Sequence, residues 1–179
     1  MIHNYNIYYF INDFNKDEIL NLNKNIGIIF RNYKDTLDIN EILKLRQFCR
    51  SNNRKLYLAN NIKLAINLNL NGVYIPAFNK DIGFNKFNTK KDFLILGSAH
   101  NIYEIKEKEK QGAEIIFLSP LFKTKKNENE LGINKFKILS RLSKKKIIAL
   151  GGISKKNINM LKITNANGFS GISFFFNNI

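Results

Sequence analysis

The chain has 179 residues and a formal net charge of +15, and both numbers limit what it can be. The length suffices for one sizeable hydrophobic core and is short for two independent domains, so we expect a single domain over residues 1–179. A hydrophobic fraction of 44% and an aromatic fraction of 12% exclude a disordered protein. A lone cysteine, Cys49, excludes an internal disulfide and fits a reducing compartment.

Targeting and membrane signals are missing from the sequence. Residues 1–6 have neither the basic stretch nor the apolar stretch of a signal peptide. No apolar run approaches the roughly 20 residues that a membrane-spanning helix needs. We therefore expect a soluble, cytoplasmic protein that has no membrane partner.

The positive charge is distributed along the whole chain. Lysine is accompanied everywhere by an excess of asparagine and isoleucine, which indicates a general compositional bias. A nucleic-acid-binding protein is the alternative, because a field of this sign attracts any polyanion, phosphates included. Without a clustered basic patch, we expect no specific binding of nucleic acid.

Eight short apolar runs recur along the chain, each followed by a polar stretch with helical spacing. The runs are almost continuously apolar, which is typical of parallel strands that are covered on both faces. Eight strands alternating with seven helices predict an α/β fold, a single (β/α)₈ (TIM) barrel, with an open doubly wound sheet as the alternative. The predicted strands are residues 7–11, 27–30, 55–58, 72–75, 93–96, 114–118, 146–150 and 168–174.

Apolar residues with helical spacing mark the segments between these strands. Cys49 lies on such a stripe, so we expect a buried small side chain and no nucleophile. Ser154 is placed to cap a helix that begins near Lys155. The predicted stripes are Ile42, Leu45 and Cys49; Phe136, Leu139 and Leu142; and Ile158 and Leu161.

Two segments fit the repeating pattern poorly. Residues 79–92 are weakly periodic, so the fourth helix is predicted to be short or irregular. The given sequence ends at Ile179, soon after the last predicted strand, so the final helix is predicted to be missing or reduced. The strand face left open would then need another cover, and a homo-oligomer is one candidate.

Two predicted strand ends form a candidate phosphate site. Gly151 and Gly152 follow the seventh strand, and Ser173 follows the eighth. Successive glycines let backbone N–H groups approach an anion, and these two loops are where barrels of this type hold phosphate. The structural alternative is a tight strand-to-helix turn that needs glycine.

Other side chains at the same end could do chemistry. His100 follows the fifth strand and could transfer a proton near neutral pH, although a hydrogen-bonded structural histidine is equally consistent. Thr124 could donate to a phosphate or carboxylate, and Arg31 could pair with one in bidentate fashion. His3, the other histidine, is expected to be idle. No group of residues has metal-ligand spacing, so we expect no metal site.

Three segments together resemble a known family. Residues 97–101, 117–124 and 149–153 resemble, in order and spacing, motifs of the thiamine-phosphate synthase/thiazole tautomerase (TenI-like) superfamily. Residues 65–76 and 167–173 add weaker matches, so the resemblance spans nearly the whole chain. It implies a phosphate-binding barrel of thiamine biosynthesis. The synthases of this family join a pyrimidine diphosphate to a thiazole phosphate and release pyrophosphate with the help of magnesium.

The resemblance also implies roles for individual residues. It assigns the thiazole phosphate to the loops after strands seven and eight, and it brings polar side chains from strands two, five and six to the rim. A lysine of the family motif after strand six falls on Lys126. The implied phosphate ligands are Gly151, Gly152 and Ser173, and the implied rim residues are Thr124, Ser98, His100 and Arg31.

The chain departs from the family pattern at several positions. A glutamine and a lysine that flank Arg31 in the family are replaced by Ile29 and Tyr33. Its two acidic magnesium ligands fall on Asn60 and Asn79, and its His-Leu-Gly-Gln segment reads Tyr-Ile-Pro-Ala at residues 74–77. Neutral amides compensate the charge of a diphosphate poorly, so magnesium is expected only if the chain is a synthase.

The sequence thus predicts an enzyme of thiamine biosynthesis with two candidate activities. One is an atypical thiamine-phosphate synthase that takes a thiazole phosphate and a pyrimidine diphosphate. The other is a metal-free thiazole tautomerase in which His100 is the acid/base, the glycine loop with Ser173 holds phosphate, and Arg31 orients a carboxylate. The non-enzymatic alternative is a degenerate barrel that binds phosphorylated ligands and regulates a partner.

Overall fold

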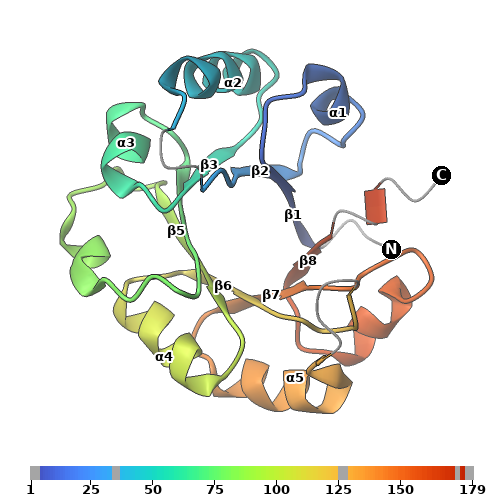
Figure 1. The fold of residues 1–179 in the computed structure, drawn as a ribbon. Helices are drawn as coiled ribbons and strands as arrows, with labels where there is room; N and C mark the ends of the chain where they lie inside the picture. Colours follow the sequence, from blue (N-terminus) through green and yellow to red (C-terminus); the bar gives the residue numbers. More distant parts are fainter. Residues whose placement is uncertain (1–4, 34–36, 125–128, 172–173, 176–179) are drawn as a thin grey trace.

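The computed structural model describes residues 5–33, 37–124, 129–171 and 174–175. Its eight strands form one closed, wholly parallel barrel in sequence order, and β8 pairs with β1 (Figure 1). This closure confirms the (β/α)₈ barrel and excludes the open sheet. The strands are β1 (Asn6–Ile11), β2 (Gly27–Phe30), β3 (Leu56–Ala59), β4 (Gly72–Ile75), β5 (Leu94–Ala99), β6 (Ile115–Leu118), β7 (Lys146–Leu150) and β8 (Gly168–Ser170).

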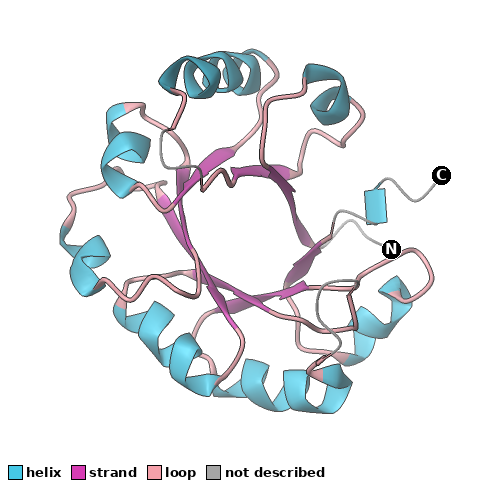
Figure 2. Ribbon diagram, viewed as in Figure 1, coloured by secondary structure: helices cyan, strands magenta, loops and turns pink. Residues whose placement is uncertain are grey.

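Helices surround the barrel on its outside (Figure 2). No helix in the described ranges is both long enough and apolar enough to cross a bilayer. The fourth connection is irregular, as predicted, because it holds only a short 3₁₀ helix. The helices between the strands are α1 (Lys16–Leu20), α2 (Ile39–Ser51), α3 (Ile62–Asn67), η1 (Ile82–Lys86), α4 (Ile102–Lys110), α5 (Gly132–Leu142) and η2 (Ile158–Ile163).

Aromatic rings fill the inside of the barrel. Phe10 and Tyr74 meet edge to face at 5.1 Å between ring centroids, and Tyr8 and Phe117 meet at the same distance. Phe117 also contacts Phe10 and Tyr74, which links the two pairs. The interior is therefore a packed core with no channel, and any ligand must bind at one of its two ends.

The second core layer lies between the strands and the helices. Ile42, Leu45 and Cys49 are buried there, as the stripe on α2 predicts. Burial raises the pKa of the Cys49 thiol to about 12, so this side chain is not a thiolate near neutral pH. The stripe predicted on α5 is partly wrong, because Leu142 is 51% exposed at the end of the helix.

The helix predicted to begin near Lys155 does not form. The side chain of Asn157 accepts from the backbone N–H of Ser154 at 2.8 Å and donates to the carbonyl of Gly152 at 2.8 Å. These two bonds fold residues 154–157 into a turn, and the helical segment is the later 3₁₀ helix η2. Ser154 therefore does not cap an α-helix.

Two strand ends also differ from the prediction. β5 continues to Ala99, since its register with β6 extends to the pair Ala99 and Leu118. This extension places Ser98 inside a strand. β8 stops at Ser170, whose hydroxyl donates to the carbonyl of Tyr8 at 2.7 Å.

The last helix is reduced, as predicted, in the described part of the chain. Phe174 and Phe175 form a short helical segment (red in Figure 1), and both pack against the hydrophobic core. Phe174 contacts the buried Phe169 of β8 at 4.8 Å between centroids, and Phe175 contacts Tyr9 of β1 at 5.5 Å. Two rings of the chain itself thus cover part of the outer face of β8. The homo-oligomer stays a prediction.

Candidate active site

Arg31, directly after β2, is a cationic group at the C-terminal end of the barrel. Its guanidinium lies 5.0 Å from the centroid of the Phe10 ring, which belongs to the aromatic core inside the barrel. Arg31 forms no ion pair with any carboxylate in the described ranges. A shallow cavity of about 390 Å³ opens beside it, lined also by Asn12, Asp13 and Tyr33. The partly buried guanidinium is therefore available to an anionic ligand.

Ser98 and Tyr74 are neighbours just below this end. Ser98 is 5% exposed, and its hydroxyl contacts the phenol of the buried Tyr74. Burial raises the pKa of Tyr74, while the nearby hydroxyl of Ser98 and the charge of Arg31 act in the opposite direction. Tyr74 is a site residue that the sequence did not single out, although it begins the segment that replaces the family motif His-Leu-Gly-Gln.

Asn60 and Asn79 meet across two loops. The Nδ2 of Asn79 donates to the Oδ1 of Asn60 at 2.6 Å. Asn60, with a φ of 61°, follows β3 and donates its backbone N–H to the carbonyl of Tyr74 at 2.8 Å. The fold thus brings together the two positions at which the resemblance implies magnesium ligands.

The donor set at this point does not fit magnesium. Two neutral amides stand where two carboxylates would compensate the ion's charge, and both amide oxygens already accept hydrogen bonds. In the described ranges, no group of three or more His, Cys, Asp and Glu residues could hold a metal ion. The expectation of no metal stays a prediction.

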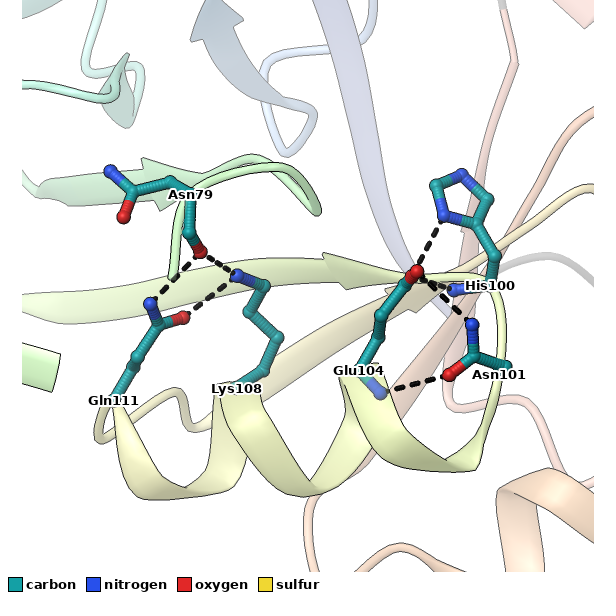
Figure 3. A network of polar contacts seen from close by, with 6 residues as sticks. All are labelled: Asn79, His100, Asn101, Glu104, Lys108 and Gln111. Carbon is teal, nitrogen blue, oxygen red and sulfur yellow. Dashed lines mark hydrogen bonds and ion pairs between the residues drawn. The ribbon is translucent and has the colours of Figure 1, made fainter. Parts of the chain in front are cut away.

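His100, after β5, is held by a glutamate on α4 (Figure 3). The Oε2 of Glu104 lies 2.8 Å from the Nδ1 of His100 and accepts the backbone N–H of His100 at 2.7 Å. Asn101 caps α4 and donates to the Oε1 of Glu104 at 3.0 Å. No described residue bonds to the Nε2 of the half-exposed imidazole. A carboxylate that orients one ring nitrogen leaves the other for proton transfer.

The same helix fixes the Asn79 loop through a buried lysine. The Nζ of Lys108 donates to the carbonyl of Asn79 at 2.6 Å and to the Oε1 of Gln111 at 2.8 Å (Figure 3). The Nε2 of Gln111 donates to the carbonyls of Asn79 and Asp81. Glu104, Lys108 and Gln111 follow helical spacing, so one face of α4 sets both loops. That spacing was the available sequence signal, and sequence reasoning missed it.

The glycines after β7 form a tight turn against the loop after β6. Gly151 and Gly152 have φ values of 93° and 67°. A Cβ on Gly152 would lie 2.4 Å from the carbonyl oxygen of Lys123, so only glycine fits there. The N–H groups of Gly152, Ile153 and Gly171 donate to no residue in the described ranges. The turn needs glycine and at the same time leaves backbone donors open.

The remaining predicted ligands are only partly described. Thr124 is partly buried in the loop after β6 and follows Lys123, whose carbonyl oxygen faces Gly152. Lys126 and Ser173 lie outside the described residues.

Comparison with known proteins identifies the family. Residues 23–175 match the family model TMP-TENI, described as thiamine monophosphate synthase. The chain belongs to this family. Because the match covers both the His100 loop and the glycine turn, the resemblance stated from the motifs is confirmed.

Relatives named thiamine-phosphate synthase are similar to this chain at low identity over most of its length. The chain is 29% identical over 160 residues to a putative thiamine-phosphate synthase 2 of Aquifex aeolicus, covering 86% of this chain and 85% of the relative. It is 30% identical over 152 residues to a thiamine-phosphate synthase of Prochlorococcus marinus, covering 82% of this chain and 44% of that longer protein.

Solved structures agree on the fold. A thiamine phosphate pyrophosphorylase from Pyrococcus furiosus superposes with a TM-score of 0.72 at 18% identity, covering 96% of this chain and 87% of that one. N-(5'-phosphoribosyl)anthranilate isomerase from the same organism gives a TM-score of 0.57 at 13% identity, covering 93% and 87% of the two chains.

The buried Lys108 of this family member predicts a pH effect on stability. Burial lowers the pKa of Lys108 from 10.5 to about 8, against the attraction of Glu107 and Glu104. Between these values the unfolded chain binds more protons than the folded chain, so this group makes the free energy of unfolding rise with pH. Relative to Lys108→Met, the parent should gain up to about 1.4 kcal/mol per pH unit in that window.

Urea unfolding of both proteins from pH 7 to 10.5 measures this difference. The exposed Lys63→Met is the matched control and should track the parent at every pH. Parallel curves for the parent and Lys108→Met would show that Lys108 titrates as an ordinary surface lysine.

Proposed function

We propose that this protein binds a thiazole phosphate and transfers a proton on it without magnesium, as a thiazole tautomerase does. The hydrogen bond between Asn60 and Asn79 carries the proposal. At the positions of the family's magnesium ligands, two amides bind each other in place of two carboxylates that would bind a dication. Proton transfer needs no such ion, whereas displacement of a diphosphate gains from one.

The phosphate end of the substrate belongs on the loop after β7. The N–H groups of Gly152, Ile153 and Gly171, which have no described acceptor, support an anion there, since open donors favour a ligand that supplies oxygen atoms. We assign Ser173, Thr124 and Lys126 to the same phosphate by family resemblance. A phosphate held at this loop directs the thiazole ring toward the centre of the barrel end.

The reacting end of the substrate then lies near His100 and Arg31. Glu104 stabilises the protonated imidazole and keeps its Nε2 as the atom that accepts and returns the proton. Arg31, which no described carboxylate neutralises, orients the substrate's carboxylate. Ser98 and Tyr74 supply a pair of hydroxyl groups beneath the ring.

A thiamine-phosphate synthase is the second candidate, and the relatives favour it. The Aquifex aeolicus and Prochlorococcus marinus relatives both carry that name. In that case a pyrimidine diphosphate would be the second substrate, and its charge would be balanced mainly by Arg31 and by lysines such as Lys126.

The phosphate assignment predicts the effect of a negative charge at the glycine loop. Gly152→Asp should raise the Kd for a thiazole phosphate about thirtyfold or more, about 2 kcal/mol, through charge repulsion and blocked N–H access. Calorimetry measures the Kd. Gly132→Asp, at another glycine of positive φ with open space around it, is the matched control and should bind normally.

A Cβ at position 152 would meet backbone atoms, so Gly152→Asp could fail to fold. A second variant keeps the phosphate assignment testable in that case. Gly171 has more room, since a Cβ added there would lie 3.3 Å from the nearest oxygen, and its N–H also has no described acceptor. Gly171→Asp should weaken binding in the same direction. Normal affinity in folded Gly152→Asp and Gly171→Asp proteins would remove phosphate from this loop.

The acid/base role predicts a separation of binding from turnover. His100→Asn should lower turnover of a thiazole phosphate carboxylate by about a hundredfold or more and leave its Kd within a few-fold. His3→Asn, at the other histidine, should leave both unchanged. Full activity in a stable His100→Asn protein would exclude the mechanism, and a parent without turnover on any thiazole phosphate would favour a regulatory binder.

The amide pair predicts independence from magnesium. In the parent, saturating magnesium should change the Kd of a pyrimidine diphosphate by less than about twofold, because the amides that replace the family's carboxylates bind the ion poorly. The double variant Asn60→Asp, Asn79→Asp should acquire magnesium-dependent binding in the same calorimetric assay. Rapid magnesium-dependent formation of thiamine phosphate by the parent would establish the synthase instead.

A further inference from the structure

A second and larger cavity lies at the N-terminal ends of the strands, opposite the candidate active site. Its volume is about 760 Å³, within the range of small-molecule pockets. We call it the basal cavity and define it by six of its lining residues, which are Lys24, Arg54, Lys55, Lys146, Tyr8 and Tyr57.

The basal cavity is separate from the candidate active site. The contacts among Tyr8, Phe10, Tyr74 and Phe117 fill the barrel between the two ends. A small molecule in one end therefore cannot reach the other through the barrel, so the basal cavity is no extension of the thiazole phosphate site.

The cavity has an excess of positive charge. Its lining contains four cationic side chains and one acidic one, Glu114. None of the four forms an ion pair with a described carboxylate. Tyr57 and Ile148 belong to the core inside the barrel. Lys55 and Lys146 come two positions before them, so alternation along an extended chain places both lysines on the same, inner side.

Arg54 is the most informative of these cations because it is buried. It is only 6% exposed, and its Nη1 and Nη2 donate to the carbonyls of Asn23 and Leu22 at 2.9 and 2.6 Å. Its buried Nε has no hydrogen-bond partner among the described residues. A guanidinium removed from water and matched only by neutral oxygens is an unbalanced charge that a nearby anion would stabilise.

Two phenols add neutral donors to the same cavity. The rings of Tyr8 and Tyr57 meet edge to face at 5.9 Å, and no described residue hydrogen-bonds to either hydroxyl. Burial raises the pKa of Tyr8 to about 12 and raises that of Tyr57 as well, so both keep the O–H at neutral pH. A Cβ on Gly27 would lie 2.9 Å from the Tyr8 ring, so the glycine leaves room for it.

We propose that the basal cavity binds a small phosphorylated anion carrying at least two negative charges. Three lysines that no described carboxylate neutralises and one buried arginine supply the charge, and two protonated phenols supply hydrogen bonds of fixed direction. The cavity volume of about 760 Å³ limits the ligand to a small molecule. This site is independent of the thiazole phosphate site and of the reaction proposed there.

Two-dimensional ¹H–¹⁵N NMR with inorganic pyrophosphate as the probe tests the site on the whole chain at physiological ionic strength. Saturable shifts should appear at the backbone amides of Gly27, Lys55 and Gly72, whatever happens at Gly152. Shifts confined to the active-site end, or shifts that rise without saturation at lysines on every face, would overturn the proposal.

A charge-matched pair of double variants separates the cavity from general basicity. Lys55→Met with Lys146→Met should raise the Kd of pyrophosphate at the basal cavity about tenfold or more. Lys63→Met with Lys135→Met removes the same charge from exposed helix positions and should change it far less. Equal effects from both pairs would overturn the proposal. Gly152→Asp should leave the Kd of pyrophosphate at the basal cavity unchanged. A wrong assignment of the phosphate loop and a wrong assignment of the basal cavity are therefore distinguished by different variants.

Discussion

Parallel pairing of β8 with β1 closes the sheet, and both ends of the barrel depend on that contact. Asn6 lies opposite Gly168, and a Cβ on Gly168 would fall 1.9 Å from the carbonyl oxygen of Asn6. The absence of a side chain at this position therefore lets the first and last strands approach each other. Closure places loops from distant parts of the sequence around one opening, so Arg31 and Gly152 belong to the same end of the molecule.

Helix α4 and its C-cap residue position two of the loops around that opening. One face of the helix holds His100 through Glu104, and the same face holds Asn79 through Lys108 and Gln111. A fully buried lysine is costly unless its ammonium finds acceptors, and here a backbone carbonyl and an amide oxygen provide them. The loop of His100 and the loop of Asn79 are thus both positioned by helix α4.

A scarcity of acidic residues is common to several features of the structure. At the candidate active site, two amides bind each other at the positions where the resemblance implies carboxylates, and Arg31 has no described anionic partner. At the basal end, cationic side chains outnumber acidic ones four to one. A chain with 29 basic and 14 acidic residues has too few carboxylates to pair with every cation, and the basal cavity gathers four of these cations in one place.

The sequence by itself determined the fold class, the family and most strand positions. Apolar runs of strand length repeat eight times, and the eight strands of the barrel lie at these runs. Gly151 and Gly152 were singled out from the sequence as a candidate phosphate loop, with a tight turn as the alternative, and their φ values of 93° and 67° show that the turn is present. His100 was found through a motif, which is also local. The assigned chemistry of these residues remains a prediction from family resemblance.

Only the tertiary structure decided which residues meet. The Asn60–Asn79 bond joins two loops, and the link from Lys108 to Asn79 spans 29 positions in the sequence. Neither contact has a sequence period, because each depends on how far one loop folds over its neighbour after the barrel has closed. The helix expected near Lys155 failed for a local reason, since Asn157 donates to the carbonyl of Gly152, five positions earlier, and closes a turn there. Local pattern specifies elements, whereas contacts between loops follow from closure.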